Sequence, residues 1–454
     1  MICLFKEERF KRFFILALGV VFFMGSLLYY SGELKPEVTH PDEVFRVRMA
    51  VYFKLFFIDR DLDNPLWQKR EIYLASPGSA YLAGLALWLG GQQDKMGEEG
   101  LDDWWNFKES SAWNLSHTKL PSAKELYILK FTMALFISLS CIAIYWICLK
   151  CFGAVTAFFS SLLFVFHPAI LECATKATFD APLIFFIILN ILWMLFFYEH
   201  FLKKRYSLSL FFAAMIGLNT AVSFLIKLQG VIAGVIFLVF CFCIIVGETA
   251  KHFKASASQS KDSASWINRI RVILASMILF GVVAATCSIL PNPCLHGRPI
   301  DGLKKMAKLR AEQINIQIKE FSTQNYFHQS YSASIIDSFP QKVRYVLFGP
   351  FMNSGRGALS FLLKFSLFVF GFISVVQAEV RFIRKNASSS FNTIILLWFA
   401  VLFVAITAII YIRFEKYYIT LIAPISIFMA FAIENILDKA INLLAGRVHL
   451  FKKL

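Results

Sequence analysis

Charged residues are scarce in this 454-residue sequence, where Asp, Glu, Lys and Arg together make up 17% of the chain. Soluble globular proteins contain about 25% charged residues and about 45–50% apolar residues. Here the hydrophobic share is 58% and the mean hydropathy is +0.62, an excess that one protein core cannot bury. The composition therefore excludes an ordinary soluble enzyme and predicts an integral membrane protein.

Several chemical motifs are also missing from the sequence. It contains no P-loop, no glycine-rich dinucleotide motif and no histidines at metal-ligand spacing. The chain has 46 basic and 30 acidic residues, which gives a formal net charge of +16. Because the basic residues stand in short runs beside apolar segments, we assign this charge to the membrane surface and expect no nucleic-acid partner.

Apolar runs of the length needed to cross a bilayer occur ten times. A membrane-spanning helix requires about 20 mostly apolar residues. The first run follows a basic N-terminal stretch, and we interpret it as an uncleaved span and not as a signal peptide. The predicted spans are 13–30, 127–149, 154–173, 181–198, 207–225, 229–246, 271–290, 359–377, 391–411 and 418–437.

The distribution of basic residues predicts the orientation of these spans. With the N-terminus in the cytoplasm, the clusters in 203–205, 247–270 and 381–385 and at the C-terminus all fall on the cytoplasmic side. Nine or eleven spans would break this agreement. We therefore expect both termini to be cytoplasmic, in a plasma or inner membrane, or in the endoplasmic reticulum of a eukaryote.

Two long segments, 31–125 and 291–356, then lie on the non-cytoplasmic face. The first contains an apolar stretch at 78–91 that is too short to span and is followed by an acidic loop. We predict that 78–91, and likewise 44–58, form helices that lie in the outer membrane interface.

The chain divides at a Ser-, Ala- and Lys-containing spacer. We predict an N-terminal transmembrane module over 1–246, a cytoplasmic linker over 247–270 and a C-terminal transmembrane module over 271–454. Cys287 and Cys294 flank a Pro-Asn-Pro turn, and whether they form a disulfide is left open.

Adjacent carboxylates occur in the string His40-Pro41-Asp42-Glu43, shortly after the first span. Such a pair could supply a general base together with a metal or substrate ligand. The alternative is a solvated loop with a Pro-Asp turn. A divalent metal is possible but unassigned, and Asp42, Glu43 and Asp180 are its only candidate ligands.

A third carboxylate, Asp180, stands at the outer entry of the fourth span and is followed by Pro182. Asp is favoured at helix N-caps, and Pro is favoured just inside a helix, so one interpretation is a simple cap. The other is a carboxylate that faces the same outer surface as Asp42. The two interpretations are compatible.

Three basic residues fall on the outer side, against the usual charge distribution of membrane proteins. Lys227 stands between the fifth and sixth spans, and Arg413 and Lys416 stand between the last two. A fixed anionic partner such as a lipid phosphate would account for them. The alternative is that these side chains reach out to lipid headgroups.

The order of these strings resembles the GT-C glycosyltransferases. After His40-Pro41-Asp42-Glu43 come Ser76-Pro77-Gly78, Cys151-Phe152-Gly153, His167-Pro168 and Asp180, and a last outer loop holds Arg413, Tyr417-Tyr418 and Pro424. This series is similar to glycosyltransferase family 39 and its protein O-mannosyltransferase-like and aminoarabinose-transferase-like relatives. The His-Pro-Asp-Glu string also resembles the family 22 mannosyltransferases.

The resemblance implies a GT-C-type helical bundle and an inverting transfer of a sugar from a polyprenyl-phosphate donor to a hydroxyl of a lipid, glycan or protein. The general base would be Asp42, with Glu43 and Asp180 as further acidic residues of the catalytic site. A lysine that the aminoarabinose-transferase branch carries before its interfacial helix is absent here. The donor phosphate would therefore contact Lys227, Arg413 and Lys416, and we place His40 and Tyr417 beside the substrate.

Two other functional classes remain open. A transporter or flippase of lipid-linked sugars would need charges near the middle of the membrane, for which Lys364 and Glu434 are the main candidates. A noncatalytic membrane scaffold would not depend on Asp42.

Overall fold

The computed structural model describes residues 8–97, 105–106, 109–118, 120–256, 263–322, 336, 338–352, 358–386, 390–410 and 418–451. Within these ranges the chain forms helices joined by turns, and they contain no strand. The all-α fold class that the sequence predicts is confirmed.

Nine helices of the described ranges are long and apolar enough to cross a membrane. They are α1 (Glu8–Gly32), α7 (Ala123–Cys151), α10 (Asp180–Leu202), α11 (Tyr206–Ile226), α12 (Val231–Ser256), α13 (Ser263–Ile289), α16 (Ala358–Asn386), α17 (Phe391–Ile409) and α18 (Ile422–Phe451). The pair α8 (Ala154–Val165) and α9 (Pro168–Thr175), which meet at 61°, passes the same test only when the two helices are taken together as one broken span. Pro168 disfavours a helical conformation at the preceding His167, so the break falls there. The prediction of about ten spans is confirmed.

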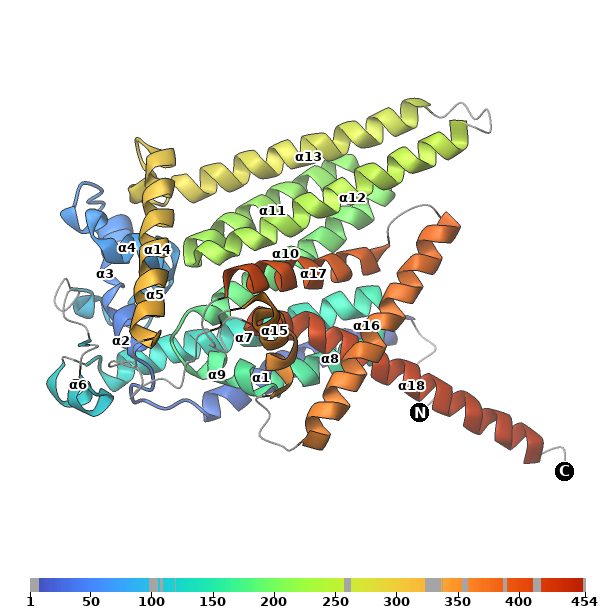
Figure 1. Cartoon of the computed structure of the whole chain (residues 1–454), viewed down its shortest axis with the longest axis horizontal. Coiled ribbons are helices and arrows are strands. Elements are labelled where there is room, and N and C mark those ends of the chain that lie inside the picture. The colour runs from blue at the N-terminus through green and yellow to red at the C-terminus, as the bar shows by residue number, and fades with distance from the viewer. Residues whose placement is uncertain are drawn as a thin grey trace.

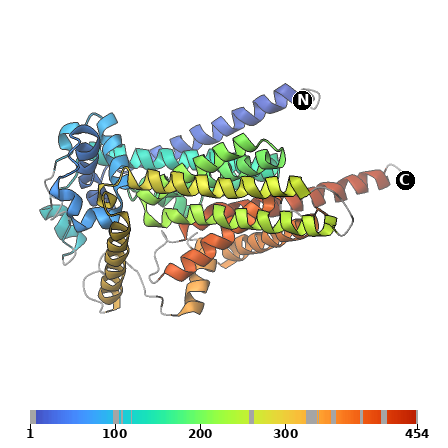
Figure 2. The same ribbon diagram turned by 90° about the horizontal axis from the view of Figure 1, so that it is seen from above.

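Short helices gather at one end of the bundle (Figure 1). They are α2 (Pro41–Arg48), α3 (Val51–Phe53), η2 (Lys54–Ile58), η3 (Pro65–Gln68), α4 (Arg70–Ala75), α5 (Pro77–Leu89), η4 (Gln93–Lys95), α6 (Ser111–His117) and η6 (Pro293–Leu295). Helix α14 (Pro299–Ser322) runs across this end, and the start of α1 and the end of α18 lie at the opposite end (Figure 2). We call these the loop end and the terminal end.

The two apolar stretches expected to lie outside the membrane spans are helical. The stretch 78–91 corresponds to α5, and 44–58 is divided among α2, α3 and η2. Helix α5 packs against α3 and α11. Gly78 permits the contact with α11, because a Cβ atom there would lie 2.6 Å from the carbonyl carbon of Leu225.

The second outer segment is bonded to the first. The Tyr81 hydroxyl donates to the carbonyl of Pro291 (2.7 Å), and the Cys294 thiol donates to the carbonyl of Trp67 (3.3 Å). Cys287 and Cys294 are both free, so no disulfide joins them. Burial raises the pKa of the Cys294 thiol to about 12, which keeps it protonated at neutral pH. The sequence did not predict the 24-residue helix α14 in this segment.

Helices from both halves of the sequence pack together. Helix α13 packs mainly on α11, and α18 packs on both α8 and α16. Helix α15 (Phe339–Met352) contacts α16 and α17, and the one-turn helix η9 (Ile419–Leu421) leads into α18. The division into modules 1–246 and 271–454 stays a prediction, and linker residues 257–262 lie outside the described ranges.

Candidate active site at the loop end

Asp42 lies in the first turn of α2. His40 caps this helix, because its Nδ1 accepts the N–H of Asp42 (3.0 Å) while Glu43 Oε2 accepts the N–H of His40 (3.2 Å). Successive residues of a helix point about 100° apart, so the neighbouring carboxylates diverge. The Asp42 side chain keeps an exposed fraction of 35%, and its Oδ2 lies 3.8 Å from His40 Nδ1.

Glu43 points into the protein, and its side chain has no exposed surface. Its Oε2 accepts the Thr39 N–H (2.7 Å), and its Oε1 accepts the Ala177 N–H (3.1 Å). Lys130 Nζ, also fully buried, lies 3.2 Å from the same Oε1. Because every one of these donors comes from the protein, the Glu43 carboxylate is enclosed and faces no substrate space.

Asp180 is the first residue of α10, and its side chain forms an ion pair with Lys227. The N-cap residue is Phe179, which is in the left-handed conformation (φ 61°) and makes no side-chain cap bond. The interpretation of Asp180 as a simple helix cap is therefore wrong. Its carboxylate is 8% exposed and is directed at a cation from another helix.

Lys227 follows the last residue of α11, where the chain turns sharply into η5 (Leu228–Gly230). Gly230 makes this turn possible, since a Cβ atom there would lie 2.1 Å from the Ser223 carbonyl carbon. The Lys227 side chain is 19% exposed and pairs with Asp180. It therefore points into the protein and does not simply reach out to lipid headgroups.

Arg46 is a further cation of the site, and the sequence analysis missed it. It is 8% exposed, its Nη1 donates to Ser79 Oγ (2.9 Å), and its guanidinium lies 5.7 Å from the centre of the Phe179 ring. Burial lowers the pKa of Arg46, while the charges of Asp42 and Asp180 act to raise it. Both carboxylates thus lie in the electrostatic neighbourhood of one guanidinium. The sequence did contain one sign of this role for Arg46. Arg46 follows Asp42 by four residues, and residues at this spacing lie on the same side of a helix.

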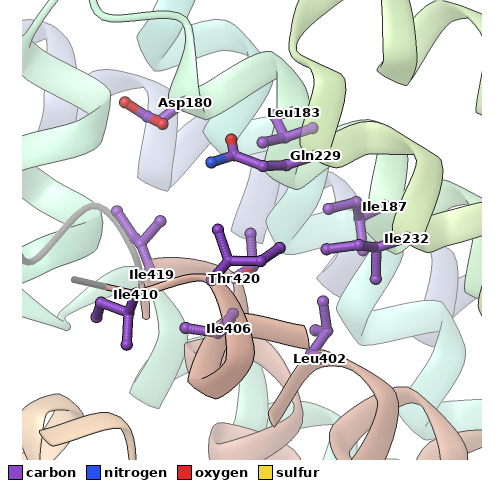
Figure 3. A pocket seen from close by; sticks show the side chains of 11 residues that line it. Asp180, Leu183, Ile187, Gln229, Ile232, Leu402, Ile406, Ile410, Ile419 and Thr420 are labelled. Atoms are coloured by element: carbon purple, nitrogen blue, oxygen red, sulfur yellow. The ribbon is translucent and has the colours of Figure 1, made fainter. Parts of the chain in front are cut away.

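An open cavity, whose empty volume of about 520 Å³ includes adjoining solvent space, lies beside the Asp180–Lys227 pair. Its wall is formed by α10, η5, α12, α17 and η9, and it is mostly apolar. Asp180 and Gln229 lie at one edge, and isoleucine and leucine side chains surround the remainder (Figure 3). The lining residues are Asp180, Leu183, Ile187, Gln229, Ile232, Leu402, Ile406, Ile409, Ile410, Ile419 and Thr420. The site thus joins a charged edge to an apolar cavity.

The three candidate metal ligands do not converge. Glu43 is turned away from Asp42 and enclosed by protein donors, and Asp180 is paired with Lys227. Among the residues that the structure describes, no group of three His, Cys, Asp or Glu side chains is placed to hold a metal ion. We derive no chemical step through a metal.

Some predicted residues fall beyond what the structure describes. Arg413, Lys416 and Tyr417 lie outside the described ranges, as does His328 of the second outer segment. Ile410 and Ile419, on either side of the stretch 411–417, both line the cavity.

Comparisons with known proteins bear on the family and the fold of this chain. A family model described as dolichyl-phosphate-mannose-protein mannosyltransferase matches residues 118–260, a range that contains Lys130, Asp180 and Lys227. A search of curated protein sequences gave no match.

Among solved structures, the apo oligosaccharyltransferase of Archaeoglobus fulgidus has a TM-score of 0.53 at 14% identity, over 97% of this chain and 53% of that one. The same archaeon's AglB, in complex with an inhibitory peptide and a dolichol-phosphate, has a TM-score of 0.51 at 15% identity, over 96% and 52%. ArnT from Cupriavidus metallidurans in the apo state has a TM-score of 0.48 at 13% identity, over 93% and 59%.

This chain has a GT-C-type fold, and its residues 118–260 match the mannosyltransferase family model. The resemblance stated from the sequence strings is confirmed. The chain covers only about half the length of the two oligosaccharyltransferase structures. In this fold, one group of charged side chains at the loop end comprises Asp42, Asp180, Lys227 and Arg46. Glu43 is buried and is not part of this group.

Proposed function

We propose that this protein is a membrane glycosyltransferase. It moves a sugar from a polyprenyl-phosphate donor to the hydroxyl of a lipid, glycan or protein acceptor on the non-cytoplasmic face, with inversion at the anomeric carbon. The observation that carries this proposal is the junction at Asp180, where an apolar cavity meets the ion pair with Lys227. The partly exposed carboxylate of Asp42 acts, like Asp180, on the guanidinium of Arg46.

Asp42 is the general base of the proposed reaction. It accepts the proton of the acceptor hydroxyl as that oxygen attacks the anomeric carbon on the side opposite the phosphate. The new bond to the acceptor oxygen forms as the anomeric bond to the phosphate oxygen breaks, and the phosphate leaves with the electron pair. No strong general acid is required, because the leaving group is already an anion.

Cations at the edge of the cavity hold the donor phosphate. Lys227 pairs with Asp180 at this edge, and the charge of Asp180 also acts on Arg46; we propose that Arg413 and Lys416 join them from the stretch 411–417. Positioned cations stabilise the charge that grows on the leaving phosphate. Tyr417 and His40 are proposed to border the donor or acceptor, and Asp180 orients Lys227.

The polyprenyl chain of the donor occupies the apolar cavity in this proposal. Its wall of leucine and isoleucine side chains suits a hydrocarbon, and its charged edge suits the phosphate. The similar fold of AglB, solved with a dolichol-phosphate, supports a lipid phosphate as the ligand class.

The two charges that a transporter would need in mid-membrane lie toward the ends of the predicted spans 359–377 and 418–437. Lys364 falls in the second turn of α16. The Glu434 carboxylate accepts a hydrogen bond from Thr156, in the first turn of α8, and lies beside Gly153. We therefore favour a transferase over a transporter or flippase.

The orientation can be tested by labelling single cysteines on a cysteine-free background. We expect cysteines placed at residues 42, 180 and 227 to react with a membrane-impermeant reagent from the outside, and cysteines at the termini only from the cytoplasm. Labelling of positions 42 and 180 from opposite sides would contradict a shared active site.

The activity itself is tested by incubating the purified protein in liposomes with a panel of radiolabelled polyprenyl-phosphate sugars. We expect one donor to lose its sugar to an acceptor, and the Asp42→Asn variant to be inactive in the same assay. If no donor in the panel supports transfer, and lipid-linked sugars instead cross the bilayer, the transferase proposal is wrong.

A further inference from the structure

The buried Glu43–Lys130 ion pair links the two carboxylates of the site. Both side chains have no exposed surface, and Lys130 Nζ lies 3.2 Å from Glu43 Oε1. The pair joins the start of α2 to the second turn of α7, which are far apart in the sequence. Burying two charges costs desolvation free energy that their attraction only partly offsets, so such a pair is weak evidence for a purely stabilising role.

One oxygen of Glu43 fixes the turn that presents Asp42. Glu43 Oε2 accepts the N–H of Thr39 (2.7 Å), the hydroxyl of Thr39 (3.2 Å) and the N–H of His40 (3.2 Å). His40 in turn accepts the N–H of Asp42. The backbone that carries the proposed base is therefore held by its neighbour.

The other oxygen of Glu43 fixes the turn that presents Asp180. Glu43 Oε1 accepts the N–H of Ala177 (3.1 Å), three residues before Asp180. The linker between them contains Phe179 in the left-handed conformation, which a bulky residue adopts only when its surroundings enforce it.

Lys130 also binds the chain segment that precedes α2. Besides Glu43, its Nζ donates to the carbonyls of Lys35 (3.0 Å) and Glu37 (2.6 Å), in the chain that leads from α1 to α2. All three donor positions of the ammonium group thus have partners, and the pair ties together the linker before α2, the start of α7 and the linker before α10.

We propose that Glu43 and Lys130 are positioning residues that fix the placement of Asp42 relative to Asp180. The proposal rests on the function proposed above, and it assigns Glu43 a role different from the catalytic one that the sequence suggested. Glu43 acts through the backbone turns on either side of it. A displacement of a reacting group by about 1 Å can lower a rate by about 10²-fold, so such a link matters for catalysis.

The test compares the variants Glu43→Gln and Lys130→Met with the double variant that carries both changes. Each single variant leaves one buried charge unpaired, so each should unfold at a lower temperature than the wild type. The double variant buries no charge, so its thermal stability should recover. In the double variant, however, the glutamine amide has only one acceptor oxygen. Its NH₂ group must face the backbone N–H groups either of Thr39 and His40 or of Ala177, so one of the two turns stays misplaced.

The measured kcat distinguishes a positioning role of the pair from a purely stabilising role. We expect kcat to fall about 10- to 100-fold in the single and the double variants, with donor affinity changed by less than about threefold. If the double variant recovers kcat together with its thermal stability, the pair only stabilises the fold and the proposal is wrong.

Glu248→Gln is the matched control. Glu248 is a buried carboxylate at the terminal end that pairs with Arg269 (2.9 Å) and Lys251 (2.8 Å). This variant should lose stability while kcat at a temperature below unfolding stays within about twofold of the wild type. An equal loss of kcat in Glu248→Gln and in the double variant would overturn the proposal.

Failure of the proposed function would look different. In that case the wild-type protein would transfer no sugar from any polyprenyl-phosphate donor. A wild-type enzyme that transfers sugar, and a double variant that transfers it equally fast, would instead contradict the positioning role alone.

Discussion

The two ends of the helical bundle hold their charges in different ways. At the terminal end, Glu199 pairs with Lys150 and with Lys203, and the Lys203 side chain is 53% exposed. The second of these pairs spans one helical turn, which is the usual arrangement on a helix surface. An exposed pair such as Glu199–Lys203 contributes little to stability.

At the loop end, two buried carboxylates are held by cations that are distant in the sequence. Glu43 pairs with Lys130 where both are fully buried, and Asp180 pairs with Lys227 across 47 residues. The carboxylate of Asp42 keeps an exposed fraction of 35%. At the loop end, two buried ion pairs thus lie close to the partly exposed carboxylate of Asp42.

The largest expected effect follows from Asp42→Asn, which keeps the size of the side chain and removes its charge. A positioned general base typically contributes about 10²–10⁴-fold in rate, so turnover should fall by at least about 10²-fold. Donor affinity should change little, because the lost interaction is made mainly in the transition state. Steady-state kinetics with donor titration measures both quantities.

Glu199→Gln removes a carboxylate from the terminal end and is the control for Asp42→Asn. It should leave turnover within about twofold of the wild type. Normal turnover by Asp42→Asn would exclude Asp42 as the base and direct attention to Asp180.

The second-largest effect is expected from removing the cations that are proposed to hold the donor phosphate. Lys227→Ala and Arg413→Ala should weaken donor binding as well as turnover, because in the proposed mechanism these groups contact the phosphate both before and during the reaction. A hydrogen bond to a charged group is worth about 1.5–3 kcal/mol, or roughly 10- to 150-fold in affinity. Equilibrium binding of the donor measures the loss.

Lys251→Ala, at the terminal end, serves as the matched control for these cation variants and should bind the donor normally. If Lys227→Ala and Arg413→Ala both retain full donor affinity and turnover, the phosphate assignment is wrong.

The smallest expected effect comes from narrowing the cavity. Ile406→Trp places a larger side chain in the cavity wall, so a donor with a long polyprenyl chain should bind several-fold more weakly, while a short-chain donor should be affected less. Val404, on the same helix, is 66% exposed, and Val404→Trp is the control. Equal losses for long and short donors would contradict a cavity that holds the lipid chain.

Much of the fold could be predicted from the sequence because hydropathy alone determines which segments cross the membrane. The bent span at His167-Pro168 was found as one run of apolar residues, although its break was not. Helix α14 was missed because its mixture of lysine and isoleucine gives no long apolar run, and its place is decided by contacts with α4 and η6.

The site was only partly predictable, because the direction of a side chain depends on tertiary contacts. Asp42 and Glu43 are adjacent in the sequence, yet one is accessible and the other is buried against Lys130. The sequence offered no sign of that partner, which lies near the start of the predicted span 127–149. Arg46 was identifiable by its spacing from Asp42, but its contact with Phe179 depends on the fold.

The most direct test of the account asks whether Asp42 serves to remove a proton. Azide is a small anionic nucleophile that requires no deprotonation, so a general base is unnecessary when it replaces the acceptor hydroxyl. With donor and azide, Asp42→Asn should form a glycosyl azide of inverted configuration at a rate near that of the wild type, while its transfer to a hydroxyl acceptor stays at least about 10²-fold slower. If azide gives no rescue while the donor remains bound, or if transfer to the hydroxyl acceptor is already normal, the assignment of Asp42 as the base is contradicted.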